Sequence, residues 1–134
     1  MIYLLDSNVC IVYLKAKNEK LKRRIEALSS ADIAVSSVTK SELFSGAKKS
    51  NNPQRSIEIQ KKFFSQFVSL PFDDNAAEFY AEARSKLEFL GTPIGPYDLQ
   101  IAAIALANNL ILVTHNVREF SRVEGLKIED WETD

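Results

Sequence analysis

Three acidic residues lie where their carboxylates could act together on a metal ion. Asp6 follows the apolar run Ile2–Leu5, and Glu42 lies in the first turns of a predicted helix. Asp98 begins another predicted helix, after a Gly-Pro-Tyr turn. Carboxylates a few ångströms apart repel one another, and a divalent cation removes that repulsion. Capping of the following helix is the alternative interpretation of Asp6 and Asp98, because Asp is a common N-cap residue.

The type of ligand narrows the choice of metal. Oxygen ligands select Mg²⁺ or Mn²⁺. The chain has one histidine and one cysteine, so it cannot assemble a His/Cys zinc set. We therefore predict a Mg²⁺ or Mn²⁺ site held by Asp6, Glu42 and Asp98.

Further polar residues follow the predicted strand Leu110–Val113. Thr114 comes directly after it, and Asn116 and Glu119 lie within the next few positions. Asn116 offers a neutral carbonyl oxygen, whereas Glu119 offers a charge, so either residue can complete the site. His115 is interpreted as an exposed loop residue, with a base or RNA contact as the alternative.

Short apolar segments alternate with amphipathic ones along the chain. This alternation predicts an α/β domain with a central, mostly parallel sheet of four to five strands and helices on both faces. In such sheets, sites form beyond the carboxyl ends of the strands. The expected strands are Ile2–Leu5, Ile33–Ser36, Val68–Pro71, Leu110–Val113 and an edge strand at Leu126–Ile128. The expected helices run from a cap at Asn8 to about Lys15, over Glu19–Leu28, from Ser37 or Thr39 to Lys49, after Pro53 to about Gln66, from Asp73 or Asp74 to Gly91, and over Ile101–Ala107.

Length and composition limit the class of protein. The chain of 134 residues suits one domain, and no apolar run approaches the ~20 residues that span a bilayer. The single cysteine, Cys10, forms no internal disulfide, and no signal peptide is evident. We therefore expect a soluble cytoplasmic protein in which Cys10 is a buried apolar residue.

Charge is distributed unevenly between the two parts of the chain. Residues 1–50 carry nine Lys/Arg and five Asp/Glu, whereas residues 51–134 carry eight and thirteen. The basic segment Lys15–Arg24 suits either phosphate contact or a solvated helix face. Arg84 is expected to face Asp98, or to form an exposed ion pair. The stretch Phe63–Phe67 is expected in the core or at a dimer interface.

Four segments together resemble the motifs of the VapC family of PIN-domain toxins. They occur in the family's order and cover nearly the whole chain. The segments are Ile2–Asn8, Ser36–Leu43, Gly91–Asp98 with Ile101–Ala103, and Leu112–Phe120. Ser7 stands where many members have Thr, and Asn116 stands where many PIN domains have a fourth acid.

The resemblance implies a single PIN domain over residues 1–134. It implies a metal-dependent endoribonuclease, the toxin of a toxin–antitoxin pair, that leaves a 5′-phosphate and a 3′-hydroxyl. It also implies a VapB-like antitoxin partner, a homodimer and an RNA substrate, with transfer RNA as the first candidate. Asp6, Glu42 and Asp98 carry over as metal-site acids, and the hydroxyls of Ser7 and Thr114 as groups that orient ligands or water.

Other nucleotide- and phosphate-processing folds fit less well. A haloacid-dehalogenase phosphatase needs a second acid where Asn8 stands, and a receiver domain needs a phosphorylatable Asp after the third strand. No phosphate-binding glycine loop is present. The remaining alternative is a PIN-like module that binds RNA or a partner with weak or no catalysis, which Asn116 favours.

Overall fold

Five parallel strands form the central sheet in a computed structural model that describes residues 1–133. The strands are β1 (Tyr3–Leu5), β2 (Ile33–Ser36), β3 (Val68–Leu70), β4 (Ile111–Val113) and β5 (Lys127–Glu129), in the spatial order β3-β2-β1-β4-β5. Every neighbouring pair is parallel. The predicted sheet is therefore confirmed, with all of its strands parallel.

Within residues 1–133, seven helices connect and follow these strands. They are α1 (Ser7–Leu14), α2 (Glu19–Ala27), α3 (Ser37–Lys48), α4 (Pro53–Phe64), α5 (Asp74–Phe89), α6 (Pro96–Ala107) and α7 (Val117–Phe120), with a 3-10 turn, η1 (Ser30–Asp32), before β2. The sequence did not predict α7 or η1, because each is too short to develop a helical period. No helix of residues 1–133 is long and apolar enough to cross a membrane.

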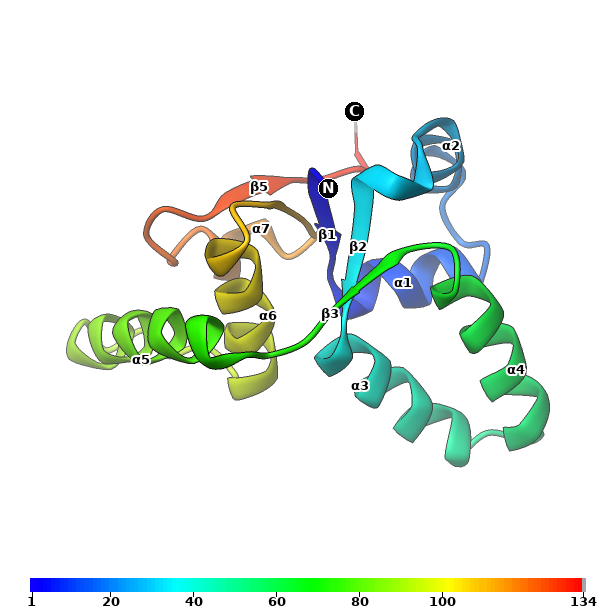
Figure 1. The fold of residues 1–134 in the computed structure, drawn as a ribbon, viewed down its shortest axis with the longest axis horizontal. Helices are drawn as coiled ribbons and strands as arrows, with labels where there is room; N and C mark the ends of the chain where they lie inside the picture. Colours follow the sequence, from blue (N-terminus) through cyan, green and yellow to red (C-terminus); the bar gives the residue numbers. More distant parts are fainter. Residues whose placement is uncertain (134) are drawn as a thin grey trace.

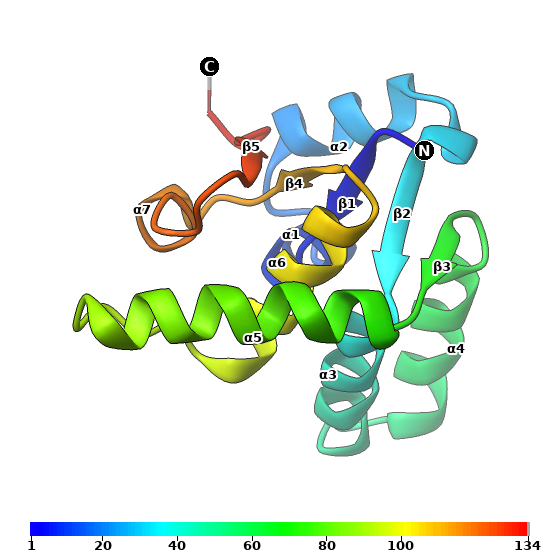
Figure 2. The same cartoon turned by 60° about the vertical axis from the view of Figure 1, so that its left-hand side comes forward.

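Side chains of the strands alternate between two apolar cores, one on each face of the sheet. Leu4 and Leu112 pack with α5 and α6, whereas Leu5 and Val113 pack with α1 to α4. Figures 1 and 2 show these two layers on opposite sides of the sheet. The buried rings of Phe63 and Phe64 belong to the second core, as predicted. Burial on both faces explains why the strands are apolar without alternation.

Side chains cap most of the helices, and one of the predicted caps was wrong. Asp6 caps α1, in place of Asn8, because its Oδ1 accepts the Val9 N–H at 2.8 Å. Ser36 caps α3, which begins at Ser37, one of its two predicted first residues. Asp73 caps α5 as expected. Gly91 follows the end of α5 with φ of +72°, a left-handed conformation that glycine adopts without strain.

The strand order places a topological switch point between β1 and β4. From β1 the chain moves outward to β2 and β3, and then returns to the other side of β1 to form β4 and β5. Asp6 follows β1 and Thr114 follows β4, so both lie at this point. Open parallel sheets bind ligands in the crevice beyond such strand ends.

Candidate active site

Asp6 is held at the switch point by contacts on two sides. Its side chain is 3% exposed, accepts the Val9 N–H and forms a hydrogen bond with the Thr114 side chain. Thr114 is fully buried, and its Oγ1 also accepts the Asn116 N–H at 3.0 Å. Asp6 is therefore a helix cap and, at the same time, a carboxylate fixed beside β4. The expectation that Thr114 orients a site acid agrees with this contact.

A relay of buried hydroxyl groups orients Glu42. Ser36 Oγ donates to Thr39 Oγ1 at 3.2 Å, and Thr39 Oγ1 lies 3.0 Å from Ser7 Oγ. Ser7 Oγ donates to Glu42 Oε1 at 2.7 Å. Each hydroxyl has one proton, so Thr39 must donate to Ser7 if all three groups are to be satisfied. The relay points its donors at Glu42 and fixes that carboxylate from α3.

Asp98 approaches the same region from the first turn of α6. It does not cap that helix, whose N-cap is Gly95 without a side-chain hydrogen bond. Burial raises the pKa of Asp98 from 3.8 to about 6, and the charges of Glu119, Asp6 and Glu42 act in the same direction. These four carboxylates therefore interact electrostatically although they come from four different elements.

Glu119 and Asn116 are both part of this arrangement. Asn116 Nδ2 donates to Glu119 Oε2 at 3.3 Å. The charge of Glu119 is, after burial, the largest contribution to the raised pKa of Asp98. Glu119 therefore lies beside a predicted metal-site acid, and Asn116 positions Glu119 through its amide.

Burial likewise raises the pKa of Asp6 to about 6 from its ordinary value of 3.8. The charges of Glu132 and Glu42 add to this rise, whereas hydrogen bonds from Thr114 and Val9 oppose it. Among residues 1–133, no lysine or arginine forms a salt bridge with Asp6, Glu42, Asp98 or Glu119. The cluster thus has excess negative charge that no basic side chain of this part of the chain neutralises.

The residues present fit a hard divalent cation. Their ligand atoms are oxygens, and the raised pKa values of two of them reflect charge that a cation would compensate. Within residues 1–133, no three of these four acids offer oxygens that all lie within 4.8 Å of one another. That spacing suits Mg²⁺, which keeps several waters and takes only one or two carboxylates directly.

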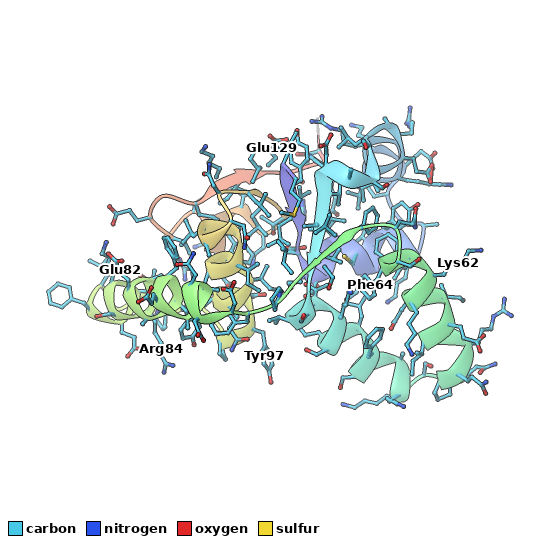
Figure 3. All side chains as sticks on the ribbon, in the orientation of Figure 1. Lys62, Phe64, Glu82, Arg84, Tyr97 and Glu129 are labelled. Carbon is cyan, nitrogen blue, oxygen red and sulfur yellow. The ribbon has the colours of Figure 1, made fainter. Side chains whose placement is uncertain are left out.

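Some sequence expectations fall outside the cluster. Arg84 forms an exposed ion pair with Glu88, to which its Nε donates at 2.7 Å. Of the two alternatives for Arg84, the structure therefore shows the exposed ion pair. Figure 3 shows Arg84 projecting from α5. In the basic segment, Arg24 pairs with Glu129 at 3.6 Å and lies over the Trp131 ring.

The segment that follows β5 was not predicted to approach the site. Glu132 is close enough to raise the pKa of Asp6, and Asp130 Oδ2 lies 3.0 Å from Nδ1 of the exposed His115. The sequence contains a signal for this, since acids that follow a parallel edge strand lie at the same rim as Asp6. The prediction that His115 is an exposed loop residue is confirmed.

Comparisons with known proteins identify the family. The family model described as PIN domain matches residues 3–126. The tRNA(fMet)-specific endonuclease VapC of Salmonella typhimurium is 40% identical over 96% of this chain and 97% of its own. Ribonuclease VapC2 of Haemophilus influenzae is 36% identical over the same shares of the two chains.

Solved structures give the same result. A DNA-bound VapBC from Salmonella typhimurium has a chain with a TM-score of 0.92 and 40% identity, covering 98% of both chains. VapBC2 from Rickettsia felis, bound to a promoter DNA fragment, has a chain with a TM-score of 0.90 and 34% sequence identity. The match covers 98% of this chain and 99% of that chain. The protein is thus an α/β domain with an acidic site at the switch point of its sheet. The chain belongs to the PIN-domain family, and within it to the VapC family.

The raised pKa values predict how metal-free stability depends on pH. An acid whose pKa is higher in the folded than in the unfolded state stabilises the fold below its unfolded pKa, near 3.8, and this stability is lost as pH rises through about 6. For the buried Asp6, the difference amounts to roughly 3 kcal/mol.

We therefore expect the thermal midpoint of the metal-free protein to fall, relative to Asp6→Asn, between about pH 4 and about pH 7. Saturating Mg²⁺ should restore the thermal midpoint at the upper end of this pH range. Thermal melts of both proteins across this range, with and without Mg²⁺, measure the effect. Parallel pH profiles for the two proteins would contradict it.

Proposed function

We propose that this chain is a Mg²⁺- or Mn²⁺-dependent endoribonuclease, the toxin of a toxin–antitoxin pair, that hydrolyses RNA phosphodiesters. The observation that carries the proposal is the group of four interacting carboxylates at the switch point, from Asp6, Glu42, Asp98 and Glu119, none of which forms a salt bridge within residues 1–133. The names of the relatives support it, since several are named ribonucleases and two are named tRNA(fMet)-specific endonucleases. Transfer RNA is therefore the proposed substrate class.

In this proposal, Asp6, Glu42 and Asp98 hold the cation, and Glu119 adds a fourth charge. A bound divalent cation supplies Lewis-acid chemistry, lowering the pKa of water and stabilising charge on a phosphoryl group. The hydroxyl relay fixes Glu42, Thr114 fixes Asp6, and Asn116 fixes Glu119. In the hydrolysis, a bond forms between the water oxygen and phosphorus, and the bond from phosphorus to the 3′-oxygen breaks. The products are a 5′-phosphate and a 3′-hydroxyl.

Metal removal tests this proposal directly. We expect the purified chain to cleave transfer RNA with Mg²⁺ or Mn²⁺ and to lose cleavage in EDTA, because the acids alone supply no electrophile. End-labelled RNA resolved on a gel measures the rate, and the ends of the products report the bond that breaks. Full-rate cleavage in EDTA would rule out the metal mechanism. RNA binding without cleavage under any metal condition would instead support the PIN-like binding module.

A partner of the antitoxin kind is proposed from a groove that leads to the site. The groove, of about 430 Å³, lies between α1, α3 and α4 and includes Ile11, Leu14, Ile59 and Glu42. Ile59 is 48% exposed, and the buried Gln60 Oε1 in the groove has no hydrogen-bond partner within residues 1–133. An incoming peptide can cover the apolar part of this groove.

We propose that a C-terminal segment of a VapB-like antitoxin occupies this groove and places a basic side chain, Arg by preference, against the carboxylates. The related VapBC structures support such a partner. Co-expression with the neighbouring gene should give a complex that Ile59→Glu weakens at least about tenfold. Lys62→Glu, on the same helix but away from the groove, is the control (Figure 3). A wild-type chain that purifies without any neighbour-encoded partner would count against the proposal.

A further inference from the structure

Beside the carboxylate cluster, a second group of metal-ligating side chains comes together that the proposed hydrolysis does not use. His115 lies in the loop after β4, and Asp130 and Glu132 lie in the segment after β5. Each offers one ligand atom, and these three atoms all lie within 4.8 Å of one another. Unlike the acids described above, this group combines an imidazole with two carboxylates.

The segment that carries the two acids is held in place by several contacts. The Glu132 N–H donates to Asp130 Oδ1 at 2.9 Å, which orients that carboxylate. Asn18 Nδ2 donates to the Glu132 carbonyl at 3.2 Å. Trp131 between them is buried and packs edge-on against Tyr3, with ring centroids 4.9 Å apart. The ligand atoms are therefore held close together by the surrounding protein, as a metal site requires.

A second observation indicates that this group is not complete without a ligand. Glu132 Oε2 is shielded from solvent, yet it has no hydrogen-bond partner within residues 1–133. A carboxylate oxygen that is removed from water without a partner is costly. A cation is the simplest species that would satisfy it, because no lysine or arginine of this part of the chain forms a salt bridge with Glu132.

We propose that His115, Asp130 and Glu132 bind one transition-metal cation of the Zn²⁺ class. Imidazole selects such ions over Mg²⁺. Bonds of about 2.0–2.2 Å in a tetrahedral site place neighbouring ligand atoms about 3.3 Å apart. His115 Nδ1 and Asp130 Oδ2 already lie 3.0 Å apart, so a cation can take the place of the proton between them after a small movement.

Three protein ligands leave one coordination position open to water or a phosphate oxygen. The bound cation would tie the segment after β5 to the loop after β4, directly beside Asp6. The inference rests on these three side chains alone, and it holds whether or not the chain cleaves RNA.

The test uses the whole chain without an affinity tag, because His115 is its only histidine. With excess Mg²⁺ present to occupy the carboxylate cluster, Zn²⁺ is titrated while the imidazole ¹H–¹⁵N signals are recorded. We expect these signals to shift and saturate at one equivalent of Zn²⁺, and Mg²⁺ alone to leave them unchanged. Co²⁺ in the same titration should give visible absorption bands of a site with low coordination number.

Variants test the ligand set. Loss of an outer-shell partner already costs about 10- to 100-fold in metal affinity, so His115→Asn and Glu132→Gln should each weaken Zn²⁺ binding at least about tenfold. Glu124→Gln, an exposed acid that pairs with Lys86 on another part of the surface, is the matched control. Zn²⁺ binding that leaves the imidazole signals unmoved, or that both ligand variants retain at wild-type affinity, would overturn the proposal.

Discussion

Asp98→Asn and Asp6→Asn should each lower RNA cleavage at least about 100-fold, a change of about 2.7 kcal/mol in the barrier. Each substitution keeps the shape of the side chain and removes one charge from the group proposed to hold the cation. The loss should appear in the rate at saturating RNA, with little change in RNA affinity, because the acids act on the reacting phosphate.

The same variants separate a functional acid from a structural one. Asp6 caps α1, but Asn caps a helix as well as Asp does, so Asp6→Asn keeps the Val9 contact. Without metal at neutral pH, both variants should match the wild type or exceed it by ~0.5–2 kcal/mol, since like-charge repulsion decreases. Asp73→Asn, at the cap of α5, is the control that should change neither property. Retained cleavage together with a large loss of stability would identify the two acids as structural residues only.

Much of the fold could be predicted because the strands are buried on both faces. A strand such as Ile33–Ser36 stands out as an apolar run bounded by polar residues, and its predicted bounds are the observed ones. Since all strands are parallel, the first polar residue after each of them falls at one rim. This rule alone places Asp6 and Thr114 correctly at the switch point.

The errors concern features that short-range patterns do not encode. Asn8 and Asp6 are both good caps, and only the extended backbone of Asp6, with ψ of 172°, decides between them. For Arg84 the sequence left two alternatives open, and the structure shows the exposed ion pair, because Glu88 four residues later satisfies the guanidinium locally. The position of Glu132 after the edge strand β5 predicts the rim of the sheet on which it lies, but its approach to Asp6 depends on how the segment after β5 turns, which a local pattern does not encode.

The site itself could be predicted only as a set of candidates. Asp6, Glu42 and Asp98 come from segments more than 30 residues apart in the chain, and only their predicted place at one edge of the sheet and the family resemblance connect them. The hydroxyl relay was not predicted beyond Ser7, because Ser36 and Thr39 look like ordinary capping residues at the start of α3. Their contribution depends on the crossing of α1 and α3, which brings Ser7 to Thr39.

Glu119→Gln should lower cleavage at least about tenfold, a barrier change of about 1.4 kcal/mol. Glu119 lies close to Asp98, and its charge is the largest contribution to the raised pKa of Asp98 after burial. No lysine or arginine of residues 1–133 forms a salt bridge with it. Glu119 therefore forms no ion pair with its neighbours Arg118 and Arg122, and its charge acts on the cluster.

Titration of Mg²⁺ distinguishes a role of Glu119 in cation binding from a general effect of the substitution on the protein. Glu119→Gln should raise the Mg²⁺ concentration at half-maximal rate, because one of four negative charges is lost. Asn116→Asp should lower that concentration, although it removes the Nδ2 donor that now holds Glu119 at 3.3 Å. Glu124→Gln, which removes a remote charge, should follow the wild-type curve. If Glu119→Gln also follows it, the site operates with three carboxylates, and the hydrogen bond from Asn116 to Glu119 serves only to order the loop after β4.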